Sequence, residues 1–133
     1  MRNRQQAFSR CSVLLSVIFL ASLLVSCQSD GAKFESRLDS GMNALEKQEY
    51  KKAEIELRNA LQIEKEDAQA YYYLGEAFLH QGKIGEAFQA YREAVALKPQ
   101  FPDAQLRMAA LYLGANRVQE AEDTARDVLH QET

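Results

Sequence analysis

The stretch that decides the fold covers residues 71–99 and reads YYYLGEAFLHQGKIGEAFQAYREAVALKP. Its apolar residues recur at spacings of three and four on both sides of Gly82, which is the pattern of two amphipathic helices joined by a short turn. Helices approach each other closely only where side chains are small, as at Gly75 and Ala87, and aromatic residues such as Tyr91 fill the space beside them. The stretch therefore predicts a pair of packed antiparallel helices.

The same pattern recurs along the chain when the sequence is shifted by 34 positions. Small and apolar residues align at this spacing in three sets: Gly41, Gly75 and Ala109; Ala53, Ala87 and Ala121; and Ala60, Ala94 and Val128. Amphipathic helices are accordingly expected at residues 34–47, 51–64, 68–81, 84–97, 102–115 and 118–130. No segment alternates as a strand would, so the sequence predicts an all-α domain at residues 34–133, made of three repeats at 34–67, 68–101 and 102–133.

The central copy carries a more specific pattern. Its key residues stand at the positions of the tetratricopeptide pattern W-x2-L-G-x2-Y…A-x3-F…P. They are Tyr71, Leu74, Gly75, Phe78, Ala87, Tyr91 and Pro99. The chain thus resembles the tetratricopeptide-repeat (TPR) family, with a tyrosine in place of the tryptophan. The resemblance implies about three helix-turn-helix repeats that form a short right-handed superhelix.

The outer copies depart from this pattern. Arg37 and Ser40 stand where the central copy has Tyr71 and Leu74, as expected of a terminal repeat with a solvated outer face. The third copy stops at Thr133, before the closing helix that related proteins usually carry. Two interpretations stay open: a minimal module of three repeats, or the first part of a longer repeat array.

The first 26 residues have the pattern of a secretory signal peptide. Arg2, Arg4 and Arg10 precede an apolar run at residues 13–25 that contains no charge. A membrane-spanning helix is the alternative, but this run is shorter than the roughly 20 residues that a span requires. Residues 1–26 are therefore predicted to form a signal-peptide helix that is not part of the folded domain.

The apolar run ends in Leu24-Val25-Ser26-Cys27, which resembles the lipobox of bacterial lipoproteins. The resemblance implies that the Cys27 sulfur receives a diacylglyceryl group and that cleavage makes this residue the new N-terminus. Two or three acyl chains, palmitate among them, hold a protein at a membrane far more firmly than one. Residues 27–33 would then be the lipidated cysteine and a short tether. The alternative is a buried cysteine that happens to follow an apolar helix.

Composition excludes several classes of function. The chain has 16 basic and 19 acidic residues, and three of the basic ones belong to the predicted signal peptide. It lacks the basic stripe that nucleic-acid binding requires. Cys11 and Cys27 are the only cysteines, and the isolated His80 and His130 are expected to be surface residues at helix ends. We therefore expect no disulfide framework, metal site, cofactor or catalytic residue.

The family resemblance also implies a binding surface. The first helices of TPR repeats usually line a concave groove that receives an extended or helical peptide from a partner. The groove residues that this implies are Leu38, Met42, Leu45, Tyr72, Glu76, Leu79, His80, Leu106, Ala110 and Leu113. Such a groove is apolar with an aromatic and an acidic spot, so it suits an apolar or weakly basic peptide, with Tyr72 as the best anchor.

One TPR subclass instead clamps the C-terminal carboxylate of chaperone tails with lysine, asparagine and arginine at five groove positions. Those positions hold Leu38, Met42, Tyr73, Asp103 and Arg107 here. Only the arginine fits, and the aspartate would repel an acidic tail. Docking of chaperone tails is therefore not expected.

Together these features predict a non-enzymatic scaffold or assembly factor that is anchored in a bacterial cell envelope by its lipid. The residue after Cys27 is Gln28, which resembles lipoproteins sent to the outer membrane, where the domain would face the periplasm. The layout resembles TPR lipoproteins of pilus assembly and of exopolysaccharide or protein export, so envelope, secretion or pilus proteins are the expected partners. An accessory of a cell-envelope enzyme and a solute- or lipid-binding lipoprotein are the alternatives, and no small-molecule substrate is expected.

Overall fold

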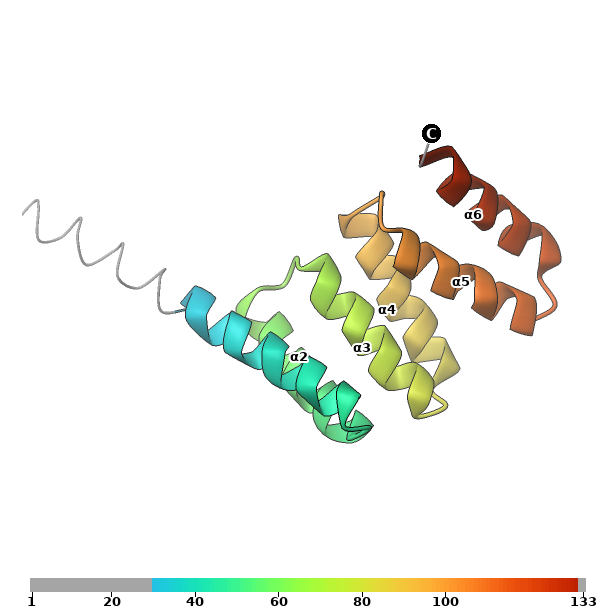
Figure 1. Ribbon diagram of the computed structural model, residues 1–133. Helices are drawn as coiled ribbons and strands as arrows, with labels where there is room; N and C mark the ends of the chain where they lie inside the picture. Colours follow the sequence, from blue (N-terminus) through green and yellow to red (C-terminus); the bar gives the residue numbers. More distant parts are fainter. Residues whose placement is uncertain (1–29, 132–133) are drawn as a thin grey trace, which may run out of the picture.

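The computed structural model describes residues 30–131, which form helices and turns without any strand (Figure 1). The first helix covers residues 30–46. It is followed by α2 (Tyr50–Ile63), α3 (Ala68–His80), α4 (Ile84–Leu97), α5 (Pro102–Gly114) and α6 (Val118–Gln131). The all-α prediction is confirmed for this range, and the helices from α2 onward begin and end within one residue of the expected bounds.

The start of the domain differs from the expectation. Residues 30–33 were expected in the short tether, but they belong to the first helix. Asp30 and Lys33 form an ion pair of 3.1 Å one turn apart, which favours the helical conformation there. The predicted signal peptide and Cys27 lie outside the described residues.

The three turns that connect the helices of a pair share one backbone conformation. Each contains a residue with positive φ, and these residues stand 34 positions apart: Gln48 (59°), Gly82 (73°) and Asn116 (58°). In each turn the next N–H donates to a carbonyl five residues earlier: Glu49 to Ala44 (2.8 Å), Lys83 to Phe78 (3.0 Å) and Arg117 to Tyr112 (2.8 Å). This is the Schellman arrangement that ends a helix by satisfying its last carbonyls.

The close packing of each pair depends on a missing side chain. A Cβ atom on Gly75 would lie 2.5 Å from Cε1 of Tyr91, and one on Gly41 would lie 2.6 Å from Cγ of Leu57. Both distances are too short for real carbon atoms, so only glycine lets α3 approach α4, and the first helix approach α2, this closely. Tyr91 and Leu57 are the largest side chains that this approach buries completely.

The helices form two rows. The helix at residues 30–46, α3 and α5 lie in front of α2 and α4 in Figure 1. Side chains of the helix at 30–46 and of α3 line one hollow, and an ion pair joins α3 to α5. We call the surface of this row the A face, and the surface of α2, α4 and α6 the B face.

Replacement of Gly75 by alanine should lower the free energy of unfolding by about 1–3 kcal/mol, because the new methyl group collides with the Tyr91 ring. Urea denaturation followed by circular dichroism measures this. Gly85→Ala in α4 is the matched control: its Cβ meets no atom within 4 Å, and alanine should stabilise that helix by up to about 1 kcal/mol. Equal unfolding free energies for the two variants would contradict the proposed role of Gly75.

Candidate functional site

Two neighbouring tyrosines of α3 lie at the centre of the A face. Asp67 starts this helix by accepting a 2.6 Å hydrogen bond from the N–H of Ala70. Tyr72 and Tyr73 are both half-buried, and their ring centroids lie 5.4 Å apart in an edge-to-face arrangement. The Tyr72 ring also contacts Phe101, at 5.2 Å between centroids. These aromatic contacts hold the ring in place before any partner binds.

The tyrosines separate two hollows of the A face. One has a volume of about 230 Å³, and its lining residues are Leu45, Tyr50, Tyr72, Tyr73, Glu76 and His80. The other has a volume of about 190 Å³, and its lining residues are Gln69, Tyr72, Tyr73, Lys98, Phe101 and Asp103. Each hollow is large enough for one side chain of a bound polypeptide. Two such side chains could therefore contact the tyrosine pair from opposite sides.

The acidic spot expected at Glu76 is present but internally neutralised. The Tyr91 hydroxyl donates to this carboxylate at 2.7 Å, and Nε of Arg107 lies 2.7 Å from it. Burial, reinforced by the hydrogen bond to Glu76, raises the pKa of Tyr91, so its hydroxyl stays a donor. Because the Glu76 side chain is only 13% exposed, it offers a partner little free charge.

An apolar stripe continues the A face on α5. Leu106, Ala110 and Leu113 stand at positions i, i+4 and i+7, which places them on one side of the helix. All three are exposed, with Leu106 at 51% and Leu113 at 57%. Large apolar side chains that remain this exposed next to an aromatic cluster are a usual sign of an interaction surface.

The structure distributes the ten expected groove residues unevenly. Met42, Leu45, Tyr72 and Leu79 are half-buried against the core and still reach the surface. Leu38 differs from the expectation, because it is only 6% exposed and belongs to the core.

His80 was expected as a surface residue at a helix end. It is exposed at the end of α3 and stacks on the ring of Tyr50, with centroids 4.6 Å apart and an angle of 5°. Tyr50 and Phe101 were not predicted in the groove, and Arg107 was placed there only as a position of the chaperone-tail clamp. For Phe101 the repeat period gave no signal, because its counterpart in the preceding repeat is the capping residue Asp67.

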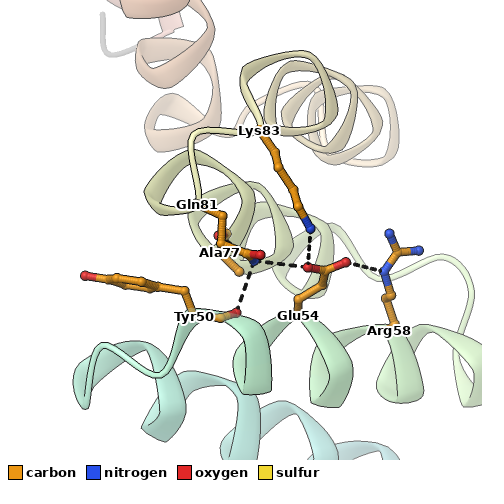
Figure 2. Close-up of polar contacts among 6 residues, drawn as sticks. All are labelled: Tyr50, Glu54, Arg58, Ala77, Gln81 and Lys83. Atoms are coloured by element: carbon orange, nitrogen blue, oxygen red, sulfur yellow. Dashed lines mark hydrogen bonds and ion pairs between the residues drawn. The ribbon is translucent and has the colours of Figure 1, made fainter.

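Glu54 of α2 links the first repeat to the second by polar contacts. Figure 2 shows Gln81 and Lys83, which follow α3, pointing at this carboxylate. The Lys83 ammonium lies 2.8 Å from it, the Gln81 amide donates to it at 3.0 Å, and Arg58 lies 3.1 Å away. Burial opposes the charge, but these donors outweigh it and lower the pKa of Glu54.

The next junction uses aromatic contacts at the equivalent place. Phe88 takes the position of Glu54 in the following repeat, and its ring lies 5.2 Å from that of Tyr112 in an edge-to-face arrangement. Arg117, the counterpart of Lys83, lies 4.7 Å from the Tyr112 ring centroid. The first and second repeats are therefore joined by polar contacts at Glu54, whereas the second and third are joined by these aromatic contacts and by the Glu76–Arg107 ion pair.

The described range offers no other obvious site of chemistry. Among residues 30–131, no group of three histidine, cysteine, aspartate or glutamate side chains is placed to hold a metal ion. Within that range no helix combines the length and the hydropathy needed to cross a membrane. The A face is therefore the candidate functional site of the described residues.

Comparison with protein families identifies the repeat. Two family models, both described as tetratricopeptide repeat, match residues 38–102 and 78–133. This confirms the repeat type that the sequence predicted. Comparison with curated proteins finds no significant match.

Solved structures share the fold. The chain is similar to MamA, with 26% identity and a TM-score of 0.72 over 74% of this chain; it spans 58% of the MamA chain. The Arabidopsis OM64 TPR domain is 22% identical, with a TM-score of 0.71 over 75% of this chain and 83% of that one. The second TPR of Spaghetti (RPAP3), bound to an HSP90 peptide, is 19% identical, with a TM-score of 0.70 over 77% and 96%.

The Glu54 contacts lead to a pH-dependent prediction. Its pKa is lower in the folded chain than its ordinary value of 4.5, so its stabilising effect is complete above pH 4.5 and is lost as the pH falls through the lowered pKa. Glu54→Gln should therefore cost about 1 kcal/mol near neutral pH and progressively less in acid.

Denaturation at several pH values measures this difference. Glu46→Gln is the control, because Glu46 is exposed and forms no ion pair within residues 30–131. A difference between wild type and Glu54→Gln that stays constant from neutral to strongly acidic pH would contradict the assignment.

Proposed function

Because residues 38–133 belong to the tetratricopeptide-repeat family, we propose that this chain is a membrane-anchored scaffold or assembly factor that binds a partner polypeptide on its A face. The observation that carries the proposal is the combination of a fixed tyrosine pair, flanked by two hollows, with an exposed leucine stripe. Neither matching family model describes an enzyme. An aromatic and apolar surface exposed on a helical repeat is suited to binding another polypeptide.

The A face favours an apolar segment as its ligand. Tyr72 is rigidly packed and offers a large ring, which gives binding energy at a low entropic cost. Leu106 and Leu113 would cover an apolar side of the bound chain. Since Glu76 is already paired with Arg107, charge contributes little to this contact.

An acidic chaperone tail remains a poor candidate for this face. Two similar structures were solved with an HSP90 peptide, but those chains are only 19% and 18% identical to this one. Of the clamp positions, Leu38 is buried in the core here, and Arg107 is occupied by Glu76. The cation that an acidic tail would need is therefore already neutralised.

The location of the scaffold is proposed from the sequence. The basic start, the apolar run and the lipobox around Cys27 support lipidation of that cysteine and attachment to the envelope, with the outer membrane as the proposed site. Components of envelope, secretion or pilus assemblies are the proposed partners. The folded domain would lie close to the bilayer, because its first helix is already formed at residue 30.

Replacement of an A-face residue should weaken partner binding without unfolding the domain. Leu106→Asp places a charge in the apolar stripe, and we expect it to weaken partner binding at least about tenfold. The partner is first identified by photo-crosslinking in cells from a reactive residue at Ala110, and affinity is then measured with the purified pair. Ile55→Asp is the matched control, because Ile55 is 52% exposed and lies on α2 of the B face. Equal affinity of both variants would contradict binding on the A face.

The anchor is tested separately. In the producing bacterium, Cys27→Ser should leave the protein unlipidated and release it from the membrane fraction, because no acyl chain can be attached to serine in this pathway. Intact mass spectrometry of the wild-type protein should show diacylglyceryl-cysteine at the new N-terminus. A wild-type protein that retains residues 1–26, or that begins with unmodified Cys27, would contradict the lipoprotein assignment.

A further inference from the structure

A larger hollow lies on the side of α3 that faces away from the A face. It has a volume of about 550 Å³ and lies between α2 and α4, with α3 as its floor. Its lining residues are Arg58, Tyr71, Leu74, Phe78, Gly85, Glu86, Gln89, Ala90 and Glu93. We call it the B-face groove. None of its lining residues contributes to the two hollows of the A face.

The floor of the groove is apolar and aromatic. Tyr71 and Phe78 stand at two positions of the tetratricopeptide pattern. Phe78 is indeed buried, but Tyr71 is only half-buried and reaches the surface. Gly85 and the small Ala90 leave the wall on α4 low, and no atom lies within 4 Å of a Cβ placed on Gly85. An aliphatic or aromatic side chain could therefore enter from solvent and rest on the Tyr71 ring.

The two walls of the groove differ in charge. On the α2 wall the guanidinium of Arg58 lies 3.1 Å from Glu54, a carboxylate that it shares with Lys83, and 5.3 Å from the Phe78 ring centroid. On the α4 wall Glu86 forms no ion pair within the described residues, and Glu93 has only a 3.6 Å contact with its neighbour Arg92. The charged residues that line the groove are two glutamates and one arginine, so the lining carries a net negative charge.

The acidic wall extends beyond the groove. The positions of Glu86 and Glu93 are occupied in the next repeat by Glu120 and Asp127 of α6. Glu120 and Asp127 thus extend the row of acidic residues along the B face. Glu120 is paired with Arg117 at 2.8 Å. A basic segment that follows the B face would meet carboxylates on two successive helices.

We propose that the B-face groove is a second docking site, which binds a polypeptide segment whose apolar side chain is flanked by lysine or arginine. The apolar side chain would cover Tyr71 and Phe78, and the flanking cations would pair with Glu86 and Glu93. This site is independent of the A face, so the domain could hold two polypeptides on opposite sides of α3. The domain could then connect two partner proteins, and not only hold a single one.

The probe for the test is a fluorescent synthetic peptide with Phe-Leu between lysine pairs, titrated into the full chain in detergent solution and followed by fluorescence anisotropy. We expect binding that weakens with added salt. The same peptide with glutamates in place of the lysines, or with serines in place of Phe-Leu, should bind at least about tenfold more weakly.

Substitutions in the chain locate the peptide. The double variant Glu86→Lys/Glu93→Lys should weaken binding at least about tenfold. Gln89→Trp, which fills the groove without changing charge, should do the same. The matched control is Glu46→Lys/Glu122→Lys, which makes the same charge change at exposed residues outside the groove and should bind as wild type does. Circular dichroism confirms that each variant is folded.

The outcomes separate this proposal from the proposed function. Loss of peptide binding in Glu86→Lys/Glu93→Lys but not in Tyr72→Ala supports the B-face groove. Loss only in Tyr72→Ala overturns it and places the peptide on the A face. Absence of binding, or equal weakening in the control double variant, also overturns it. So does self-association of the wild-type chain that Gln89→Trp abolishes, because a second copy would then occupy the groove.

Discussion

The close approach of α3 and α4 at Gly75 is the constraint on which the rest of the structure depends. Because no side chain stands there, Tyr91 can lie against the α3 backbone and be buried completely. Its hydroxyl then reaches Glu76, and the same carboxylate holds Arg107 of α5. The absence of a side chain at Gly75 thus links the packing inside the second repeat to the position of the third. The pairing with Arg107 also neutralises Glu76 at the centre of the A face.

The two junctions between repeats solve the same geometric problem with different chemistry. At the first, the Glu54 carboxylate accepts from Gln81 and pairs with Lys83, both of which follow α3. At the second, Phe88 takes the corresponding place and packs on Tyr112. The first junction is therefore sensitive to acid and salt, whereas the second combines the packing of these rings with the Glu76–Arg107 ion pair between α3 and α5. The relative orientation of the helices that form the A face rests on both.

Repeat period and helix bounds could be predicted because they depend on residue types at fixed spacing, as with Gly41, Gly75 and Ala109. The spacing does not determine which face of a helix is buried, because burial depends on neighbours from other helices: Leu38 has a groove position but lies in the core. Pairings such as Glu76 with Arg107 could not be found from the period, because the repeat counterparts of Arg107 are Asp39 and Tyr73. The B-face groove was missed for a related reason. Its floor residues belong to the repeat pattern itself, and only the coordinates show how much of Tyr71 remains uncovered.

The turns also influence which helix pair unfolds first. Gln48 and Asn116 adopt a left-handed conformation that costs residues other than glycine about 1 kcal/mol, whereas Gly82 adopts it freely. Among α2 to α5, α3 alone begins with a side-chain cap, which Asp67 provides. The central helix pair therefore combines the relaxed turn with the capped start, and amide hydrogens there should exchange with solvent last. Local unfolding would begin in the outer pairs and leave the helix that carries both surfaces as the last ordered element.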